Sequence, residues 1–217
     1  MTMTDASSHD RLFLALYPDA DQRDAIAMLE SELANERALG GRPRWVPPRQ
    51  AHVTLVFLGD VARERRGDVV AAARCAAAGA APFRWRFGGL GGFPTPRRPK
   101  VLWLGVEEGG DAARSLHEAL ATELAAAQLA PPDPRPFSPH LTLARLRDRR
   151  AGPVPDRPAT TPYATVEALH VMRSELGARG AVHKVVARIP LGRPAPSCGD
   201  RQDERAPTSN ANTVSFR

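Results

Sequence analysis

The pattern His-x-Thr-Leu occurs twice in this chain, beginning at His52 and at His140. Each copy opens a short run with β character, 52–58 and 140–146. Side chains alternate between the two faces of a strand, so the histidine and threonine of each copy point the same way. The apolar residues of each copy point to the other face, toward a core. Two such imidazole–hydroxyl pairs, facing each other, could hold a small anion between them.

An internal repeat surrounds the two copies. A strand at 11–16, a helix, a proline-containing connector and the first copy form one unit. A strand at 101–106, a helix, a proline-rich connector and the second copy form the other. A pseudo-twofold relation between the units would bring both copies to the centre of one cleft. The sequence therefore predicts an α+β fold of two pseudo-symmetric lobes, mostly antiparallel sheet with helices on the outer faces.

Hydrophobic spacing predicts the remaining elements. Helices are expected over 19–39, 63–78 and 111–129, with Asp19 or Asp21 capping the first and Asp111 the last. Further strands are expected at 83–87, 164–172 and 181–189, the last two joined by a hairpin at 174–180. Residues 88–99, rich in glycine, proline and arginine, are expected to form a long loop.

The ends of the chain lack this periodicity. Residues 1–10 are predicted to be a disordered leader and residues 193–217 a disordered tail, leaving one bilobal domain over 11–192. No apolar run approaches the roughly 20 residues that span a bilayer. The polar N-terminus is unlike a secretory signal. We therefore expect a cytoplasmic protein that does not enter a membrane.

The charge of the chain favours an anionic ligand. The net charge is +6, and Lys100 and Lys184 are the only lysines, so nearly all positive charge is arginine. The guanidinium group binds phosphate with two parallel hydrogen bonds. A composition biased toward alanine, arginine, glycine and proline explains the same excess equally well.

Two histidines across a phosphodiester can perform acid–base chemistry. One takes a proton from water and the other gives a proton to the departing alkoxide, because imidazole titrates near neutral pH. The threonine hydroxyls can donate to the phosphate oxygens. The sequence has no HExxH motif, cysteine pair, P-loop or GxSxG elbow, so we predict neither a metal nor a cofactor. A single histidine in a strand is more often structural, but the repeated pattern favours catalysis.

Four segments resemble a known family: RLFLAL, RWVPPRQAHVTLVFLGD, GGLGGFPTPRRPKVLWLGV and RPFSPHLTLARL. They are similar to two-histidine phosphoesterases, and most of all to the RNA 2′,3′-cyclic phosphodiesterases, also called 2′-5′ RNA ligases. The resemblance spans about 11–191. It implies metal-independent hydrolysis of an RNA or nucleotide 2′,3′-cyclic phosphate to a 2′-phosphomonoester, and reversible joining of that end to a 5′-hydroxyl. We expect a monomer.

The resemblance also assigns residues. It implies that His52 protonates the leaving 3′ oxygen, that His140 activates water, and that Thr54 and Thr142 bind the phosphate. Arg145 matches an arginine that contacts the phosphate, although a simple pleat puts it on the face opposite His140 unless the strand bends or bulges. The remaining assignments are Phe13 as a base-stacking platform or a core aromatic, His183 as a substrate contact where similar proteins carry tyrosine, and His117 and His170 as a helix-surface and a strand residue without a catalytic role.

Three other functions fit parts of this pattern. The same machinery could act on a small nucleotide cyclic phosphate. A non-catalytic protein could keep the site to bind RNA ends, although the intact histidines and threonines argue against this. A structural protein could bind nucleic acid nonspecifically through its phosphates. End-selective binding without turnover would distinguish the second function from the third.

Overall fold

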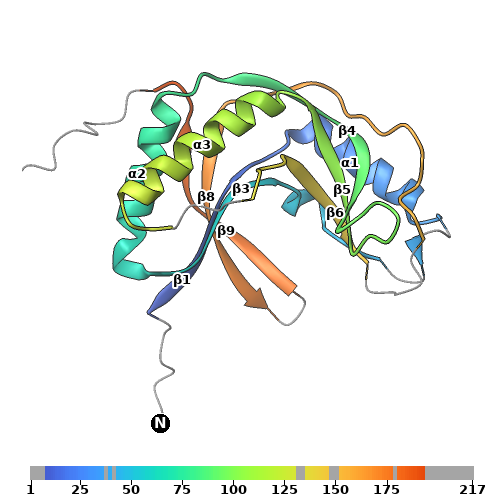
Figure 1. Ribbon diagram of the computed structural model, residues 1–217, viewed down its shortest axis with the longest axis horizontal. Coiled ribbons are helices and arrows are strands. Elements are labelled where there is room, and N and C mark those ends of the chain that lie inside the picture. The colour runs from blue at the N-terminus through green and yellow to red at the C-terminus, as the bar shows by residue number, and fades with distance from the viewer. Residues whose placement is uncertain are drawn as a thin grey trace, which may run out of the picture.

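The computed structural model describes residues 8–36, 39–40, 43–130, 135–146, 152–177 and 180–193 (Figure 1). The strands in these ranges are β1 (His9–Leu16), β2 (Arg44–Trp45), β3 (Val53–Ala62), β4 (Phe83–Phe93), β5 (Val101–Glu108), β6 (His140–Arg145), β7 (Ala164–Val166), β8 (Ala168–Gly177) and β9 (Gly180–Pro190). The helices are α1 (Ala20–Leu33), α2 (Arg66–Ala78) and α3 (Gly110–Ala126), with 3-10 turns η2 (Pro48–Gln50) and η3 (Arg63–Arg65).

One antiparallel sheet runs through the molecule in the order β7-β4-β5-β6-β3-β1-β8-β9, and β2 pairs with β6. Read outward from its centre, the sheet has two matching halves, β3-β1-β8-β9 and β6-β5-β4-β7. The two strands that carry the His-x-Thr-Leu copies are neighbours in the middle. The predicted α+β class and the pseudo-symmetric, antiparallel arrangement are confirmed.

The helices and one face of the sheet enclose the main apolar core. Leu16, Val53, Leu104 and Leu141 lie side by side across the central strands, and each is completely buried. Ile26 of α1, Val69 of α2 and Leu116 of α3 belong to the same cluster, as do many other residues of these elements. The face that carries the histidines is therefore the one that the three helices leave open.

The helices α1 and α3 each lie over the half of the sheet that is formed by the strands of the other repeat. The α3 helix follows β5, but the Nδ1–H of His117 donates to the Leu55 carbonyl of β3 (2.9 Å) while its ring stacks on Phe137. The α1 helix follows β1, but it lies near β4 and β5 (Figure 1), and the Gln22 amide donates to the Pro162 carbonyl (3.0 Å). His117 therefore connects helix to sheet, contrary to the expected surface position.

The helix ends differ from the predicted ones. Asp19 caps α1 as expected, since its carboxylate accepts from the Gln22 N–H (2.9 Å). The helix ends at Leu33, because the Asn35 side chain donates to the Ser31 carbonyl that a longer helix would use (3.2 Å). Asp111 is not the N-cap of α3. Gly109 holds that position with φ +79°, and a side chain there would collide with the Arg84 carbonyl.

The glycine-rich run after Phe87 is a strand, contrary to the predicted loop. Residues 88–93 continue β4 along β5, and only 94–100 form the connection. A Cβ at Gly91 would overlap the Trp103 ring, and one at Gly88 would overlap the Glu107 side chain. Glycine in a strand marks this kind of close approach. The hairpin between β8 and β9 also differs, since the two strands stay paired through Gly177 and Gly180.

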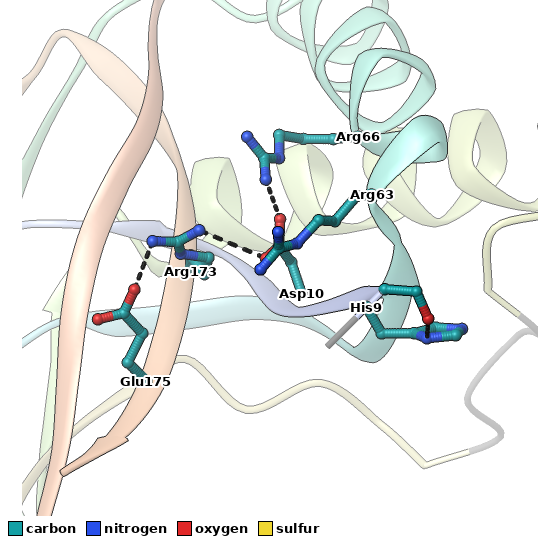
Figure 2. Close-up of polar contacts among 7 residues, drawn as sticks. His9, Asp10, Arg63, Arg66, Arg173 and Glu175 are labelled. Atoms are coloured by element: carbon teal, nitrogen blue, oxygen red, sulfur yellow. Dashed lines mark hydrogen bonds and ion pairs between the residues drawn. The ribbon is translucent and has the colours of Figure 1, made fainter. Parts of the chain in front are cut away.

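The first strand begins at His9, inside the predicted leader. Asp10 is only 3% exposed and lies among Arg63, Arg66 and Arg173, the last of which also pairs with Glu175 (Figure 2). These contacts fix the start of β1 to η3, α2 and β8. Residues 1–7 and 194–217, where the leader and tail were expected, lie outside the described ranges. Within those ranges, no helix has the length and apolar character needed to cross a membrane.

Candidate active site

The sheet register brings the two His-x-Thr copies together. Val53 of β3 pairs with Leu141 of β6 in antiparallel orientation, with both side chains in the core. The residues on either side of this pair point to the opposite face. The two copies therefore lie at the centre of the sheet, with His140 near enough for its charge to affect the pKa of His52.

Each imidazole ring makes the same kind of hydrogen bond, to the backbone carbonyl two residues before it. Nδ1 of His52 lies 2.6 Å from the Gln50 carbonyl oxygen, and Nδ1 of His140 lies 2.7 Å from the Ser138 carbonyl oxygen. A carbonyl only accepts, so Nδ1 carries the proton in each ring. Nε2 is consequently the nitrogen that is left to exchange protons with a ligand. This arrangement is the same in the two halves of the molecule.

The surroundings of His52 are enclosed. Its ring lies 5.1 Å from that of Phe13, 5.2 Å from that of His183 and 5.6 Å from that of Tyr17. Burial lowers the pKa of His52 to about 4, helped by the nearby imidazoles of His183 and His140 and opposed by the hydrogen bond to Gln50. His52 is therefore neutral at pH 7 while no anion is bound.

The surroundings of His140 are an aromatic wall. Phe93 meets its ring edge to face at 4.9 Å, and Trp103 lies 6.0 Å away. Phe93 is 37% exposed, although it touches the histidine. The two halves of the site thus match in their histidines and threonines and differ in what surrounds them.

The structure brings Arg145 to the same face as His140. Thr142 pairs with Trp103 and Ala144 with Leu102, so β6 has one extra residue at this point. The bulge shifts the alternation, and Arg145 lies opposite Val101, two residues from Trp103 on β5. Of the alternatives that the sequence left open, the strand bulge is the one observed.

The other two predicted site residues lie on the His52 side. Phe13 is 3% exposed and packs against both His52 and His183 (5.1 and 4.9 Å between ring centroids), so its ring has little surface for a base. His183 of β9 is half-buried, and burial lowers its pKa. Both residues border the first histidine, and Phe13 forms the floor beneath it.

Sequence reasoning missed four residues of this face: Tyr17, Phe93, Trp103 and His170. Burial raises the pKa of Tyr17 to about 12 and lowers that of His170, whose ring meets Tyr17 at 5.1 Å. Phe93 belonged to the predicted glycine-rich loop and Trp103 to a predicted apolar strand. Nothing in the sequence around either residue indicated a function. The alternation of Phe13 with Ala15 along β1 predicts that Tyr17 shares their face.

No group of three or more His, Cys, Asp or Glu side chains in the described ranges lies close enough together to hold a metal ion. The site as described consists of imidazoles, hydroxyls, aromatic rings and one guanidinium.

Comparisons with known proteins agree with this geometry. Residues 32–178 match the family model for the 2′-5′ RNA ligase superfamily. The chain belongs to this superfamily. Two relatives named RNA 2′,3′-cyclic phosphodiesterase are those of Aquifex aeolicus, 32% identical over 69% of this chain and 82% of that protein, and of Thermus thermophilus, 34% identical over 83% of this chain and 90% of that protein.

Two solved structures share the fold of this chain. A crystal structure of a Thermus thermophilus protein has a TM-score of 0.70 and 32% identity, and covers 84% of this chain and 98% of that chain. The apo form of LigT from Escherichia coli has a TM-score of 0.69 at 22% identity, and covers 86% of this chain and 100% of that chain. The resemblance drawn from the sequence is therefore confirmed.

Proposed function

We propose that this superfamily member is an RNA 2′,3′-cyclic phosphodiesterase. It hydrolyses the cyclic phosphate of an RNA or nucleotide end to a 2′-phosphomonoester and reversibly joins such an end to a 5′-hydroxyl through a 2′-5′ linkage. The observation that carries the proposal is the pairing of Val53 with Leu141, because it puts two Nδ1-anchored histidines on one face with their Nε2 atoms available. The names of the relatives support the same activity.

The proposed mechanism needs only side chains of this chain. Thr54 and Thr142 donate hydrogen bonds to the non-bridging oxygens, and Arg145 stabilises the charge that develops on them. Nε2 of His140 takes a proton from water while the water oxygen attacks phosphorus. The P–O3′ bond breaks, and Nε2–H of His52 gives its proton to the departing oxygen.

His52 must acquire that proton when substrate binds. Its pKa of about 4 keeps it neutral in the free protein. A phosphate anion in contact with the imidazole favours the charged form and raises the pKa. The enclosed first histidine therefore becomes an acid only when the substrate is in place, with Phe13 supporting its ring and His183 as a further contact to the substrate.

The first experiment is incubation with a nucleoside 2′,3′-cyclic phosphate in excess EDTA, followed by identification of the product. A 2′-phosphomonoester, absent with His52→Ala, supports the reaction class, its direction and its independence of metal. A 3′-phosphate would reverse the proposed orientation. The absence of turnover on this substrate and on an oligonucleotide with a cyclic phosphate end would refute the proposal. A cytoplasmic, monomeric protein remains our expectation from the sequence.

A further inference from the structure

The row of residues next to the His140 wall carries an exposed aromatic ring and positive charge. Phe93 of β4 pairs with Val101 of β5, and Val101 pairs with Arg145 of β6. Residues directly opposite in antiparallel strands share a face, so these three side chains lie in one row on the face of the histidines. Trp103 and Thr142 form the row between them and His140.

The β4–β5 connection adds further cations. Arg97, Arg98 and Lys100 are exposed on residues 94–100, and no aspartate or glutamate occurs from 87 to 106. The Leu146 N–H donates to the Lys100 carbonyl (2.9 Å), which ties this connection to the end of β6 that bears Arg145. Positive charge therefore gathers beside the exposed Phe93, and this surface is continuous with the site.

The ring of Phe93 packs on the ring of Trp103. The glycine at position 91 lets the Trp103 ring lie against β4, and Phe93 packs on that ring with centroids 5.4 Å apart. The apolar core does not need Phe93, which lies on the open face. Exposed aromatic rings beside cations are the usual means of binding single-stranded nucleic acid, because bases stack on the ring and phosphates contact the cations.

We propose that Phe93, Arg97 and Arg98 bind the RNA strand that supplies the 5′-hydroxyl in the joining reaction. This inference rests on the proposed function, in which His140 activates the nucleophile, so whatever lies beside His140 is on the nucleophile's side. In joining, the 5′-hydroxyl oxygen takes the place of water and attacks phosphorus. Its proton passes to His140, the P–O3′ bond breaks, and His52 protonates O3′, leaving a 3′-hydroxyl and a 2′-5′ phosphodiester.

The test compares the two strands in a ligation assay. Phe93→Leu keeps the apolar contact with Trp103 and removes the stacking face. We expect the KM for the 5′-hydroxyl strand to rise about tenfold, as expected for loss of one stacked base. The KM for the cyclic-phosphate strand and the hydrolysis of a nucleoside 2′,3′-cyclic phosphate should change much less than the KM for the 5′-hydroxyl strand. Tyr163→Leu, an exposed aromatic outside this surface, is the matched control.

Charge is tested separately. The double variant Arg97→Ala with Arg98→Ala should weaken binding of a fluorescent 5′-hydroxyl oligonucleotide and make the salt dependence of that binding less steep. Arg74→Ala with Arg114→Ala removes the same charge from α2 and α3 and should do neither. Binding of this oligonucleotide can be measured even if no turnover occurs, so failure of the enzyme assay and failure of this inference are distinguishable.

Three results would overturn the inference. Phe93→Leu could weaken mononucleotide hydrolysis as much as ligation, which would assign Phe93 to the reacting nucleotide. It could raise the KM of the cyclic-phosphate strand instead, which would put the other strand on this surface. It could change neither ligation nor oligonucleotide binding, which would leave the ring without a ligand.

Discussion

His52 and His183 lie edge to face with ring centroids 5.2 Å apart, and both rings contact the buried Phe13. Protonating one imidazole therefore disfavours protonation of the other, and the pKa of His52 falls mainly because of burial and further because of this neighbour. The active form carries one proton on the pair of His52 and His140, so activity falls at low pH where both are protonated. We expect this acidic limb of kcat/KM to lie near pH 4, well below the ordinary histidine value of about 6.5. A pH–rate profile on a nucleoside cyclic phosphate measures it.

The His183→Asn variant checks the cause of this low limb. It removes a neighbouring charge and admits water, and both changes raise the pKa of His52. The acidic limb should move toward neutral pH while the alkaline limb changes less. Both limbs of the profile report the interacting pair of histidines. An acidic limb already at pH 6 or above in the unaltered protein would therefore contradict a pKa of His52 that is lowered by burial and by His183.

Single removal of either histidine tests the chemistry directly. His52→Ala and His140→Ala should each lower kcat by about 10²- to 10⁴-fold, the usual contribution of one general acid or base. The matched control is His117→Ala, which removes the bond to the Leu55 carbonyl and the stacking on Phe137 from the other face. It should lower the free energy of unfolding by about 1 kcal/mol with kcat nearly unchanged. Full activity in either of the first two variants would rule out the two-histidine mechanism.

Glycine 91 provides a test of the His140 wall. Gly91→Ala puts a methyl group into the Trp103 ring, so the ring must move, and Phe93 and His140 with it. We expect a loss of about 1–3 kcal/mol in unfolding free energy, as for other overpacked sites, together with lower activity. Gly67→Ala is the control. An added Cβ at position 67 has nothing within 4 Å. This variant should therefore raise the free energy of unfolding, measured by urea denaturation, by about 0.5–1 kcal/mol, because alanine favours the helix α2 more than glycine does.

The Asp10 cluster should contribute to stability and not to catalysis. Burial of the carboxyl raises its pKa, but the bond with Arg66 and the charges of Arg66, Arg173 and Arg63 outweigh burial, so the pKa is lowered (Figure 2). Asp10→Asn leaves three arginines without their shared anion and should cost about 1–2 kcal/mol at pH 7, since the arginines are partly screened by water. Mononucleotide hydrolysis should be unaffected.

The pH dependence of this difference follows from the sign of the shift. The stabilisation by ionised Asp10 is fully present above the unfolded-state pKa of about 3.9, and it is lost as pH falls through the lower folded-state value. Urea denaturation of both proteins should therefore show a gap at pH 7 that narrows below about pH 4. A gap that stays constant down to pH 2 would mean that the charge of Asp10 is not what stabilises the fold.

The parts of the fold that depend on local pattern could be predicted from the sequence. The His-x-Thr-Leu copies and their surrounding repeat indicated that both copies lie at the centre of one cleft, because alternation and duplication both leave a direct mark on the residues, although the order of the strands could not be predicted. Arg145 could not be assigned to a face, since a one-residue bulge in β6 depends on how β5 pairs with it. His117 was misplaced because only the exchange of helices between halves brings α3 over β3.

The aromatic wall shows a different limit. Glycine and proline after Phe87 are ordinary loop signals, and nothing local distinguishes a loop from a strand whose glycines make room for a partner's side chains. Residues 88–93 form a strand whose Gly91 makes room for the ring of Trp103 on β5. This contact is tertiary, because Trp103 lies ten residues after Phe93. Phe93 and its neighbours therefore became visible as a site only with the pairing of β4 and β5.

The crossed helices mean that the two repeats cannot be separated. If β1-α1-β3 were made alone, its apolar strands would lack the cover that α3 supplies, and α1 would have no β4–β6 sheet to cover. Two such fragments could satisfy each other only by exchanging helices, in the manner of a swapped dimer. In the single chain, the two repeats exchange their helices within one molecule. Cutting the chain between the repeats should therefore yield halves that fold only when mixed.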